Sequence, residues 1–432
     1  MLRSVPVAFI LAVAVVSDAQ TQGSPTPQQL NREGRWSEAA SLAERQLASP
    51  GSLSLTEKCE LRAMLAYAYS KTDRRREATE QASRGRAECL PLGEHWTIAE
   101  FSKITDAGPA GRSLVAGTDD GWTTARPEAI GLDTVALAEH RTLCDQSGAD
   151  ACLVAHDGRI VQEWYGPDYT EPMMTMSSVK SWTAILAVLL VIDGKLDLRD
   201  PVSKWIPEWK AGSEGGVTVH HLLTMTSGLE NRTAAGKSSV GGAGDKNAFV
   251  FALPLSYRPG ARWAYSNEGS QLLSPILERA AGIPLERYAR ERLFAPLEMQ
   301  NTELRLDQAD NPWTYADANT TLRDFAKVCQ LILDRGRWRG RQIIPAAWVD
   351  SLTRPIAQNP GYGMSWWLSQ DPVVQATGGY LNTDCYAVPE LRLVVARMQN
   401  TPRPSARLSY RTASTIGPDV VRLWGRIVGR PR

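Results

Sequence analysis

The chain has 432 residues, of which 43% are hydrophobic and 22% are charged, and its formal net charge is +1. A chain of this length can bury a sizeable core and form more than one structural unit. The nearly balanced charge argues against a partner that is recognised through a strongly basic surface, so we expect no nucleic-acid partner.

The N-terminus has the pattern of a secretory signal peptide. Arg3 precedes an apolar run, and the small residues Ser17 and Ala19 follow it. Such segments are removed during export, so we predict a signal peptide over residues 1–19 and a periplasmic or secreted mature protein. An uncleaved anchor is the alternative. The apolar run 184–192 is shorter than the roughly 20 residues that cross a bilayer, so no stable membrane span is expected after cleavage.

All six cysteines lie in the part of the chain that would be exported: Cys59, Cys89, Cys144, Cys152, Cys329 and Cys385. An oxidising compartment permits disulfides, and the even count is compatible with them. Six cysteines in a chain this long do not make a disulfide scaffold, and some of them could be buried thiols. Their pairing cannot be read from the sequence.

Residues 23–103 are predicted to form a helical module. Apolar residues recur at helical spacing in GRWSEAASLAERQLASPG, and LTEKCELRAMLAYAYSKTDRRREATEQASRGRAECLP has the pattern of a helix pair with a polar turn. The pairs resemble tetratricopeptide units, which rarely stand alone in so small a number. A protein or peptide could bind residues 26–90, although a helical extension without a ligand is the simpler interpretation. Residues 104–128 are rich in Gly, Asp and Thr and are predicted to be a linker.

A second unit is predicted over residues 129–432. It begins with a helix capped by Asp133, followed by the hairpin ACLVAHDGRIVQEWYG with Asp157-Gly158 as its turn. A long helical region is expected over roughly 177–350. Short strands should follow near 362–368, 384–388 and 392–398, before a final helix. Strands at both ends of the unit predict an α+β fold whose sheet combines distant segments.

Ser177 and Lys180 lie three residues apart at the start of the apolar segment TMSSVKSWTAILAVLLVIDGKL. Residues at this spacing share a helix face, with Cβ atoms roughly 5–6 Å apart. The positive helix end and burial both disfavour a further positive charge, so they favour a neutral amine that can accept the Ser177 proton. The same helix end offers the Ser177 N–H to a developing oxyanion. This pattern indicates an activated nucleophile, although a solvated surface pair would have the same spacing.

A second candidate group is the Tyr265–Asn267 stretch of YRPGARWAYSNEGSQLL, which follows a Pro-Gly turn and precedes a helix. Tyr265 could project beside the nucleophile, with Asn267 holding substrate or the Lys180 amine. Tyrosine ordinarily titrates near pH 10, so a base role at neutral pH would need support from an adjacent ammonium. Whether Lys180 or Tyr265 takes the proton stays open at this point. A buried tyrosine with a capping asparagine is the structural alternative.

Four segments in the right order, within roughly 125–430, resemble the penicillin-recognising serine hydrolases. This family includes class C β-lactamases, D,D-peptidases, and their esterase and 6-aminohexanoate-dimer-hydrolase relatives. The segments are MSSVKSWTAILAVLLVIDGKLDLRDPVSKWIPEW, VTVHHLLTMTSGL, PGARWAYSNEGSQLL and LERYARERLFAPLEM. The resemblance implies an antiparallel sheet flanked by helices with a helical insertion, here preceded by the small all-α module. It implies Ser177 as the acyl-accepting nucleophile and Lys180 as its partner. Tyr265 would be the general base or acid, with Asn267 in support.

The family's third motif is a strand with Lys or His, then a small residue, then Gly, and it corresponds here to QATGGYLNTDCYAV. Neither Ala376 nor Thr377 supplies the cation that helps hold the substrate carboxylate in β-lactamases and D,D-peptidases. Its loss favours neutral ester or amide substrates. The residues expected to line the substrate and oxyanion site are Thr377, Gly378, Gly379 and Tyr380. Glycines permit close backbone approach, and one N–H of this segment should complete the oxyanion hole.

These patterns predict an exported serine hydrolase that cleaves an ester or amide through an acyl-enzyme on Ser177. No metal or organic cofactor is implied, since the five histidines lack metal-ligand spacing, and His221 is interpreted as structural. β-Lactamase or D,D-peptidase activity is the nearest alternative, and the missing cation argues against it. A non-catalytic binding protein with a hydrolase-like domain is the other alternative, but such a protein would not need all four site residues together.

Overall fold

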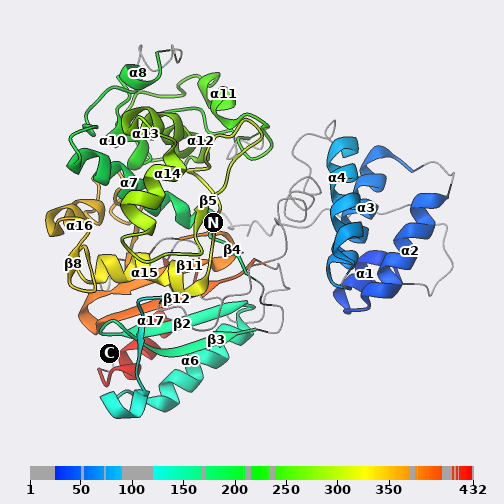
Figure 1. The fold of residues 1–432 in the computed structure, drawn as a ribbon, viewed down its shortest axis with the longest axis horizontal. Coiled ribbons are helices and arrows are strands. Elements are labelled where there is room, and N and C mark those ends of the chain that lie inside the picture. The colour runs from blue at the N-terminus through cyan, green and yellow to red at the C-terminus, as the bar shows by residue number, and fades with distance from the viewer. Residues whose placement is uncertain are drawn as a thin grey trace, which may run out of the picture. The chain divides into compact units, whose positions relative to one another are not determined.

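The chain divides into two compact units, residues 1–110 and 111–432, each with its own core (Figure 1). The computed structural model describes residues 25–49, 53–72, 74–89, 120–166, 169, 171–207, 209, 216–232, 239–369, 375–376, 378–400, 411–412, 415–416 and 418–430. The predicted signal peptide and most of the predicted linker therefore lie outside the described residues. Within the described residues, no helix is both long enough and apolar enough to cross a membrane.

The first unit is helical over its described residues. Its helices are α1 (Pro27–Arg32), α2 (Trp36–Ala48), α3 (Leu55–Ser70) and α4 (Arg75–Cys89). Thr26 and Ser54 begin α1 and α3 with capping boxes, which satisfy backbone N–H groups that a helix end leaves without partners. The buried core consists mainly of alanines, and the Cys59–Cys89 disulfide joins α3 to α4.

The second unit is built on a seven-stranded sheet with the order β1-β3-β2-β12-β11-β10-β9. These strands are β1 (Thr123–Thr124), β2 (Ala151–His156), β3 (Arg159–Tyr165), β9 (Trp367–Leu368), β10 (Gln375–Ala376), β11 (Asp384–Val388) and β12 (Leu393–Met398). All neighbours are antiparallel except β1 and β3. The centre pairs β2 with β12, with Val154 opposite Val395, so the predicted α+β sheet of distant segments is confirmed.

Helices cover both faces of this sheet (Figure 1). α6 (Thr134–Gln146) and α17 (Pro418–Ile427) pack on one face around Trp424. α15 (Leu322–Leu333) contacts β2, β11 and β12 on the other face, and the almost entirely buried α7 (Val179–Ile192) belongs to the same core. The remaining helices are α8 (Val202–Trp205), α10 (Val219–Leu223), α11 (Lys246–Phe251), α12 (Asn267–Gln271), α13 (Leu273–Ala281), α14 (Leu285–Ala289) and α16 (Ala346–Leu352).

Two sequence expectations about this unit need correction. The predicted linker is too long, because Trp122 packs on Trp338 with ring centroids 5.3 Å apart and Thr123–Thr124 forms the edge strand β1. A short strand, β4 (Met173–Met174), precedes the region predicted as helical. It pairs with one of several short strands that lie inside that region. Those strands are β5 (Glu303–Leu304), β6 (Ala318–Thr320), β7 (Arg337–Trp338) and β8 (Arg341–Gln342). Strands of two or three residues are too short to show an alternating pattern.

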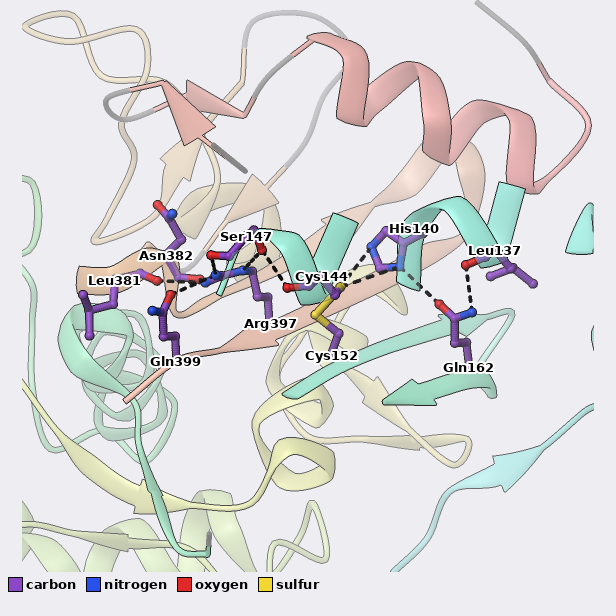
Figure 2. The surroundings of a disulfide bond; sticks show 10 residues. All are labelled: Leu137, His140, Cys144, Ser147, Cys152, Gln162, Leu381, Asn382, Arg397 and Gln399. Atoms are coloured by element: carbon purple, nitrogen blue, oxygen red, sulfur yellow. Dashed lines mark hydrogen bonds between the residues drawn. A yellow bond between two sulfur atoms is a disulfide. The ribbon is translucent and has the colours of Figure 1, made fainter. Parts of the chain in front are cut away.

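A second disulfide joins Cys144 of α6 to Cys152 of β2 (Figure 2). Cys329 and Cys385 are buried free thiols. His140 lies one turn before Cys144 and is fully buried, with Nδ1 3.3 Å from Gln162 Oε1. Burial lowers the pKa of His140 to about 4, so the folded protein keeps this imidazole neutral.

Mild acid should destabilise the second unit through His140. Its pKa is about 4 when folded and near 6.5 in an unfolded chain, so the unfolded state binds the proton first as the pH falls. The stabilisation is complete above pH 6.5 and is lost between pH 6.5 and 4, by up to about 3 kcal/mol. Urea unfolding of the wild type and His140→Gln across this range measures the effect. The variant should show a shallower pH dependence, and coincident slopes would exclude His140 as the source.

The Cys59–Cys89 disulfide should contribute much of the stability of the first unit, because that core is small. Its sequence separation is 30, for which chain entropy predicts about 3–4 kcal/mol. In the full chain, Cys59→Ser/Cys89→Ser should accelerate hydrogen exchange across α3 and α4. Exchange in β2 and β12 of the other unit serves as the internal control and should not change. Unaltered protection of α3 and α4 would contradict this assignment.

Candidate active site

Ser177 lies in a short 3-10 turn, Met176–Ser178, that leads directly into α7. The Ala318 N–H donates to Thr175 Oγ1 at 2.9 Å, and the Asp317 N–H donates to the Met176 carbonyl at 3.0 Å. Met176 has a φ of 51°, a left-handed conformation that is uncommon for a residue with a side chain. These contacts hold a bend in which Ser177 is half-buried while both of its neighbours are buried.

The Lys180 amine is buried, and the side chain is 3% exposed. Its Nζ lies 3.1 Å from Ser177 Oγ and 2.9 Å from Asn267 Oδ1, and it also donates to the Tyr315 carbonyl oxygen. The structure thus brings together Ser177, Lys180 and Asn267 from two helices that are far apart in the sequence.

Two of the three partners of Lys180 can only accept hydrogen bonds. The amide oxygen of Asn267 and the carbonyl oxygen of Tyr315 carry no proton, so they take two N–H groups of the amine. The remaining position of the tetrahedral nitrogen faces Ser177 Oγ. A charged amine places an N–H there, whereas a neutral amine places its lone pair there. The geometry would therefore let a neutral amine at this position accept the Ser177 hydroxyl proton.

Tyr265 contributes its ring to the same site. The ring centroid lies 4.9 Å from Lys180 Nζ, within the range of a cation–π contact, and the ring stacks on Trp367 at 5.9 Å. Tyr315 places its own ring 5.8 Å from the amine. Burial and the neighbouring Tyr265 raise the pKa of Tyr362 well above its usual value, so this tyrosine stays protonated. Lys180 Nζ makes the hydrogen bond to Ser177 Oγ, and the Tyr265 ring lies beside the Lys180 amine.

Local sequence explains the position of Asn267. Gly260, in the Pro-Gly turn, has a φ of 75°, a conformation that glycine adopts readily. The Ala264 N–H then donates to the Met225 carbonyl at 2.9 Å. Ser266 caps α12 by accepting the Gly269 N–H at 2.9 Å, so Asn267 is held as the first helical residue.

The third predicted segment approaches the residues that flank Ser177 through its backbone. Gly378 and Gly379 are buried, and a Cβ on Gly379 would lie 2.5 Å from the Thr383 carbonyl oxygen and 3.1 Å from Ser178 Oγ. The Gly379 N–H donates to Asp384 Oδ1 at 3.0 Å, so it does not serve an oxyanion in this structure. Thr377 and the Tyr380 side chain lie outside the described residues, and the roles expected of them stay predictions.

Sequence reasoning missed three contributors: Tyr315, Ser178 and Thr383. Tyr315 holds Lys180 through a backbone carbonyl, for which no side-chain pattern exists. Ser178 stands next to the nucleophile and donates to the Thr383 carbonyl at 2.9 Å. A serine following the nucleophile could have signalled such a contact, but its distant partner could not be identified from the sequence.

A cavity of about 510 Å³ lies elsewhere in the second unit and is lined in part by His221, Tyr257 and Arg258. Of the predicted site residues that the structure describes, none lines it. His221 Nδ1 accepts the Thr218 N–H at 3.2 Å, and this local bond fits the structural interpretation of His221. In the described part of the chain, no cluster of three or more His, Cys, Asp or Glu could hold a metal ion.

Placing a carboxylate beside Lys180 should impair nucleophile activation. Asn267→Asp would stabilise the ammonium form, so the pH at which Ser177 labelling by a fluorophosphonate is half-maximal should rise by about 1–2 units. Gln300→Glu adds the same charge at an exposed turn and should leave the profile unchanged. Rates of labelling between pH 5 and 10 provide the measurement. Superimposable profiles for Asn267→Asp and the wild type would argue against Lys180 as the proton acceptor.

Comparison with known proteins identifies the family of this chain. Residues 142–415 match the Beta-lactamase family model. The 6-aminohexanoate-dimer hydrolase of Paenarthrobacter ureafaciens is 22% identical over 363 residues, which cover 76% of this chain and 90% of that protein. Esterase EstB of Burkholderia gladioli is 32% identical over 210 residues, covering 40% of this chain and 53% of the esterase.

The fold comparison gives the same result. The solved structure of a penicillin binding protein from Bacillus halodurans has a TM-score of 0.50 and 18% identity, covering 60% of this chain and 94% of that one. The family match spans more than half of the chain. The chain therefore belongs to the beta-lactamase family and is a serine hydrolase of the beta-lactamase fold.

Proposed function

We propose that this protein hydrolyses an ester or amide bond of a substrate without a recognised carboxylate, through an acyl-enzyme on Ser177. The observation that carries the proposal is the hydrogen bond between Lys180 Nζ and Ser177 Oγ, with the two other donor positions of the amine occupied by acceptors. A half-buried serine beside a buried amine is accessible to substrate while its partner is shielded from water.

The acyl-transfer step follows from this geometry. Ser177 Oγ forms a bond to the substrate carbonyl carbon while its proton passes to the Lys180 lone pair, and the carbonyl π electrons move to the oxygen. When the tetrahedral intermediate collapses, the bond to the alkoxide or amine breaks, and the leaving group takes up the proton. We assign that proton relay to Tyr265, as the family resemblance of its motif implies, and its ring centroid lies 4.9 Å from the amine. Water then repeats the sequence and releases the acid.

The developing oxyanion needs N–H donors near Ser177. The 3-10 turn before α7 would offer the Ser177 N–H, and the start of α7 adds the positive end of its helix dipole. The second donor would come from Gly378 or Tyr380, because Asp384 takes the Gly379 N–H. This arrangement would place the carbonyl oxygen between the beginning of α7 and the segment that leads from β10 into β11.

The substrate preference rests on charge. No Lys, Arg or His occurs between Arg354 and Arg392, a stretch that contains the whole third motif. A substrate carboxylate would find no cationic partner from this segment, whereas an uncharged group could pack against the half-buried rings of Trp367 and Tyr265. Some relatives are named putative D-alanyl-D-alanine carboxypeptidase or beta-lactamase, so D,D-peptidase and β-lactamase activity are the alternatives.

We also propose that the protein is exported. Residues 1–19 have the pattern of a signal peptide, and the disulfides Cys59–Cys89 and Cys144–Cys152 suit an oxidising compartment. The helical module would then accompany the hydrolase unit outside the cytoplasm and offer a surface to a protein or peptide partner.

The test combines a probe with a substrate comparison. The wild type should be labelled stoichiometrically by a fluorophosphonate and should hydrolyse p-nitrophenyl butyrate, while Ser177→Ala should lose both activities by at least about a thousandfold. Ser351→Ala, a serine on α16, serves as the matched control. Nitrocefin and an acylated D-Ala-D-Ala peptide, which carry carboxylates, should be turned over far more slowly. Nitrocefin turnover as fast as ester turnover would overturn the substrate class, and an unlabelled folded wild type would overturn the nucleophile.

A further inference from the structure

A fully buried arginine of the central sheet, Arg397 in β12, joins two parts of the second unit (Figure 2). Its Nε donates to Ser147 Oγ at 3.1 Å, and its Nη2 donates to the Ser147 carbonyl at 2.7 Å. Its Nη1 donates to the Leu381 and Asn382 carbonyls at 2.8 and 2.7 Å. Desolvating a guanidinium is costly, and these hydrogen bonds offset that cost.

The carbonyls on one side of Arg397 belong to a strained turn. Leu381 has a φ of 58° and Asn382 a φ of 57°, and a left-handed leucine is disfavoured unless its surroundings enforce it. Both carbonyls are bound by the same guanidinium nitrogen, so Arg397 enforces this conformation. Only Tyr380 separates this turn from Gly378 and Gly379, the glycines of the third motif.

The same turn is packed against the nucleophile. Thr383 follows it, and its carbonyl accepts the Ser178 hydroxyl at 2.9 Å. Gly379 approaches so closely that an added Cβ would lie 3.1 Å from both Ser178 Oγ and the Thr175 carbonyl. A displacement of the turn would therefore move the glycine segment relative to Ser177.

The other side of Arg397 is anchored by the helix α6. Ser147 is the C-cap of α6, and its hydroxyl donates to the Cys144 carbonyl at 2.9 Å. Cys144 is joined to β2 by the disulfide with Cys152. Figure 2 shows this arrangement, with Arg397 between Ser147 and the Leu381–Asn382 turn. The guanidinium thus connects a covalently fixed helix end to the segment that faces the nucleophile.

We propose that Arg397 is a positioning residue for acyl transfer: it holds the Leu381–Asn382 turn so that the Gly378–Gly379 segment stays in register with Ser177. This role rests on the proposed function. It requires a planar group whose separate nitrogens reach both sides, which a lysine ammonium cannot replace. Arg397 acts through the turn, so its loss should slow the chemical step more than it weakens substrate binding.

Arg397→Lys keeps the charge and most of the apolar stem and provides the main test. With p-nitrophenyl butyrate, kcat should fall by about 10- to 100-fold, because misplacement by about 1 Å at a reacting centre has effects of that size. KM should stay within twofold, and the rate of fluorophosphonate labelling should fall in parallel with kcat. Arg392→Lys, which directly precedes the same strand and is paired at the surface with Asp157 and Asp334, is the control and should keep the wild-type kcat.

The outcomes separate this role from the proposed function. A wild type that neither turns over the ester nor reacts with the probe refutes the function and this role with it. An active wild type and a folded Arg397→Lys with unchanged kcat refute the positioning role alone, and so does a loss that appears only in KM. If Arg397→Lys does not fold, Ser147→Ala decides, because it removes the Nε acceptor and the local bond to the Cys144 carbonyl but leaves the Nη1 and Nη2 contacts to backbone carbonyls. It should lower kcat by a few-fold, and an unchanged kcat would overturn the proposal.

Discussion

The buried amine of Lys180 is the constraint around which the site is organised. It sits near the beginning of α7, where the helix end disfavours positive charge, and it is held by the Asn267 amide oxygen and the Tyr315 carbonyl. Each of these contacts comes from a different segment, so α7, the start of α12 and the loop before β6 have to meet at one nitrogen. Because these two contacts occupy two positions around the Lys180 nitrogen, the remaining position faces Ser177 Oγ. An arrangement that is unfavourable for the helix alone thereby becomes useful for activating a hydroxyl.

The third motif combines a retained backbone with a changed charge. Its glycines still approach the residues that flank the nucleophile, and the close contact of Gly379 with Thr383 leaves no room for a side chain. The cation expected of carboxylate-binding relatives is absent from the stretch between Arg354 and Arg392. Under the proposed function, backbone atoms of this segment set the geometry for acyl transfer, whereas its side chains would recognise the substrate. A side chain can therefore change while the backbone geometry is preserved.

The sequence predicted the elements that have a strong local signal. The hairpin around Asp157-Gly158, the helix capped by Asp133, the two central C-terminal strands and the final helix lie close to where the patterns indicated. Ser177, Lys180 and Asn267 were predicted from a residue spacing and ordered motifs, and the structure places Ser177 and Asn267 within hydrogen-bond distance of the Lys180 amine. Contacts made by backbone carbonyls carry no such mark, so Tyr315 and Thr383 could not be foreseen. Arg397 resembles any arginine in a strand until the pairing of β12 with β2 and β11 shows that it is buried.

The central pairing of β2 with β12 has a consequence for the order in which the enzyme becomes complete. Synthesis produces Ser177, Lys180 and Asn267 well before the chain reaches β11 and β12, whereas the turn beside the nucleophile depends on Arg397 near the end. A growing chain would hold a serine and a lysine on a helix with no finished surface opposite them. Contacts this distant in sequence form late in folding. Under the proposed function, a chain truncated before β11 would keep Ser177, Lys180 and Asn267 in its sequence, but it would lack the central strand β12 and the turn beside Ser177 and would therefore be inactive.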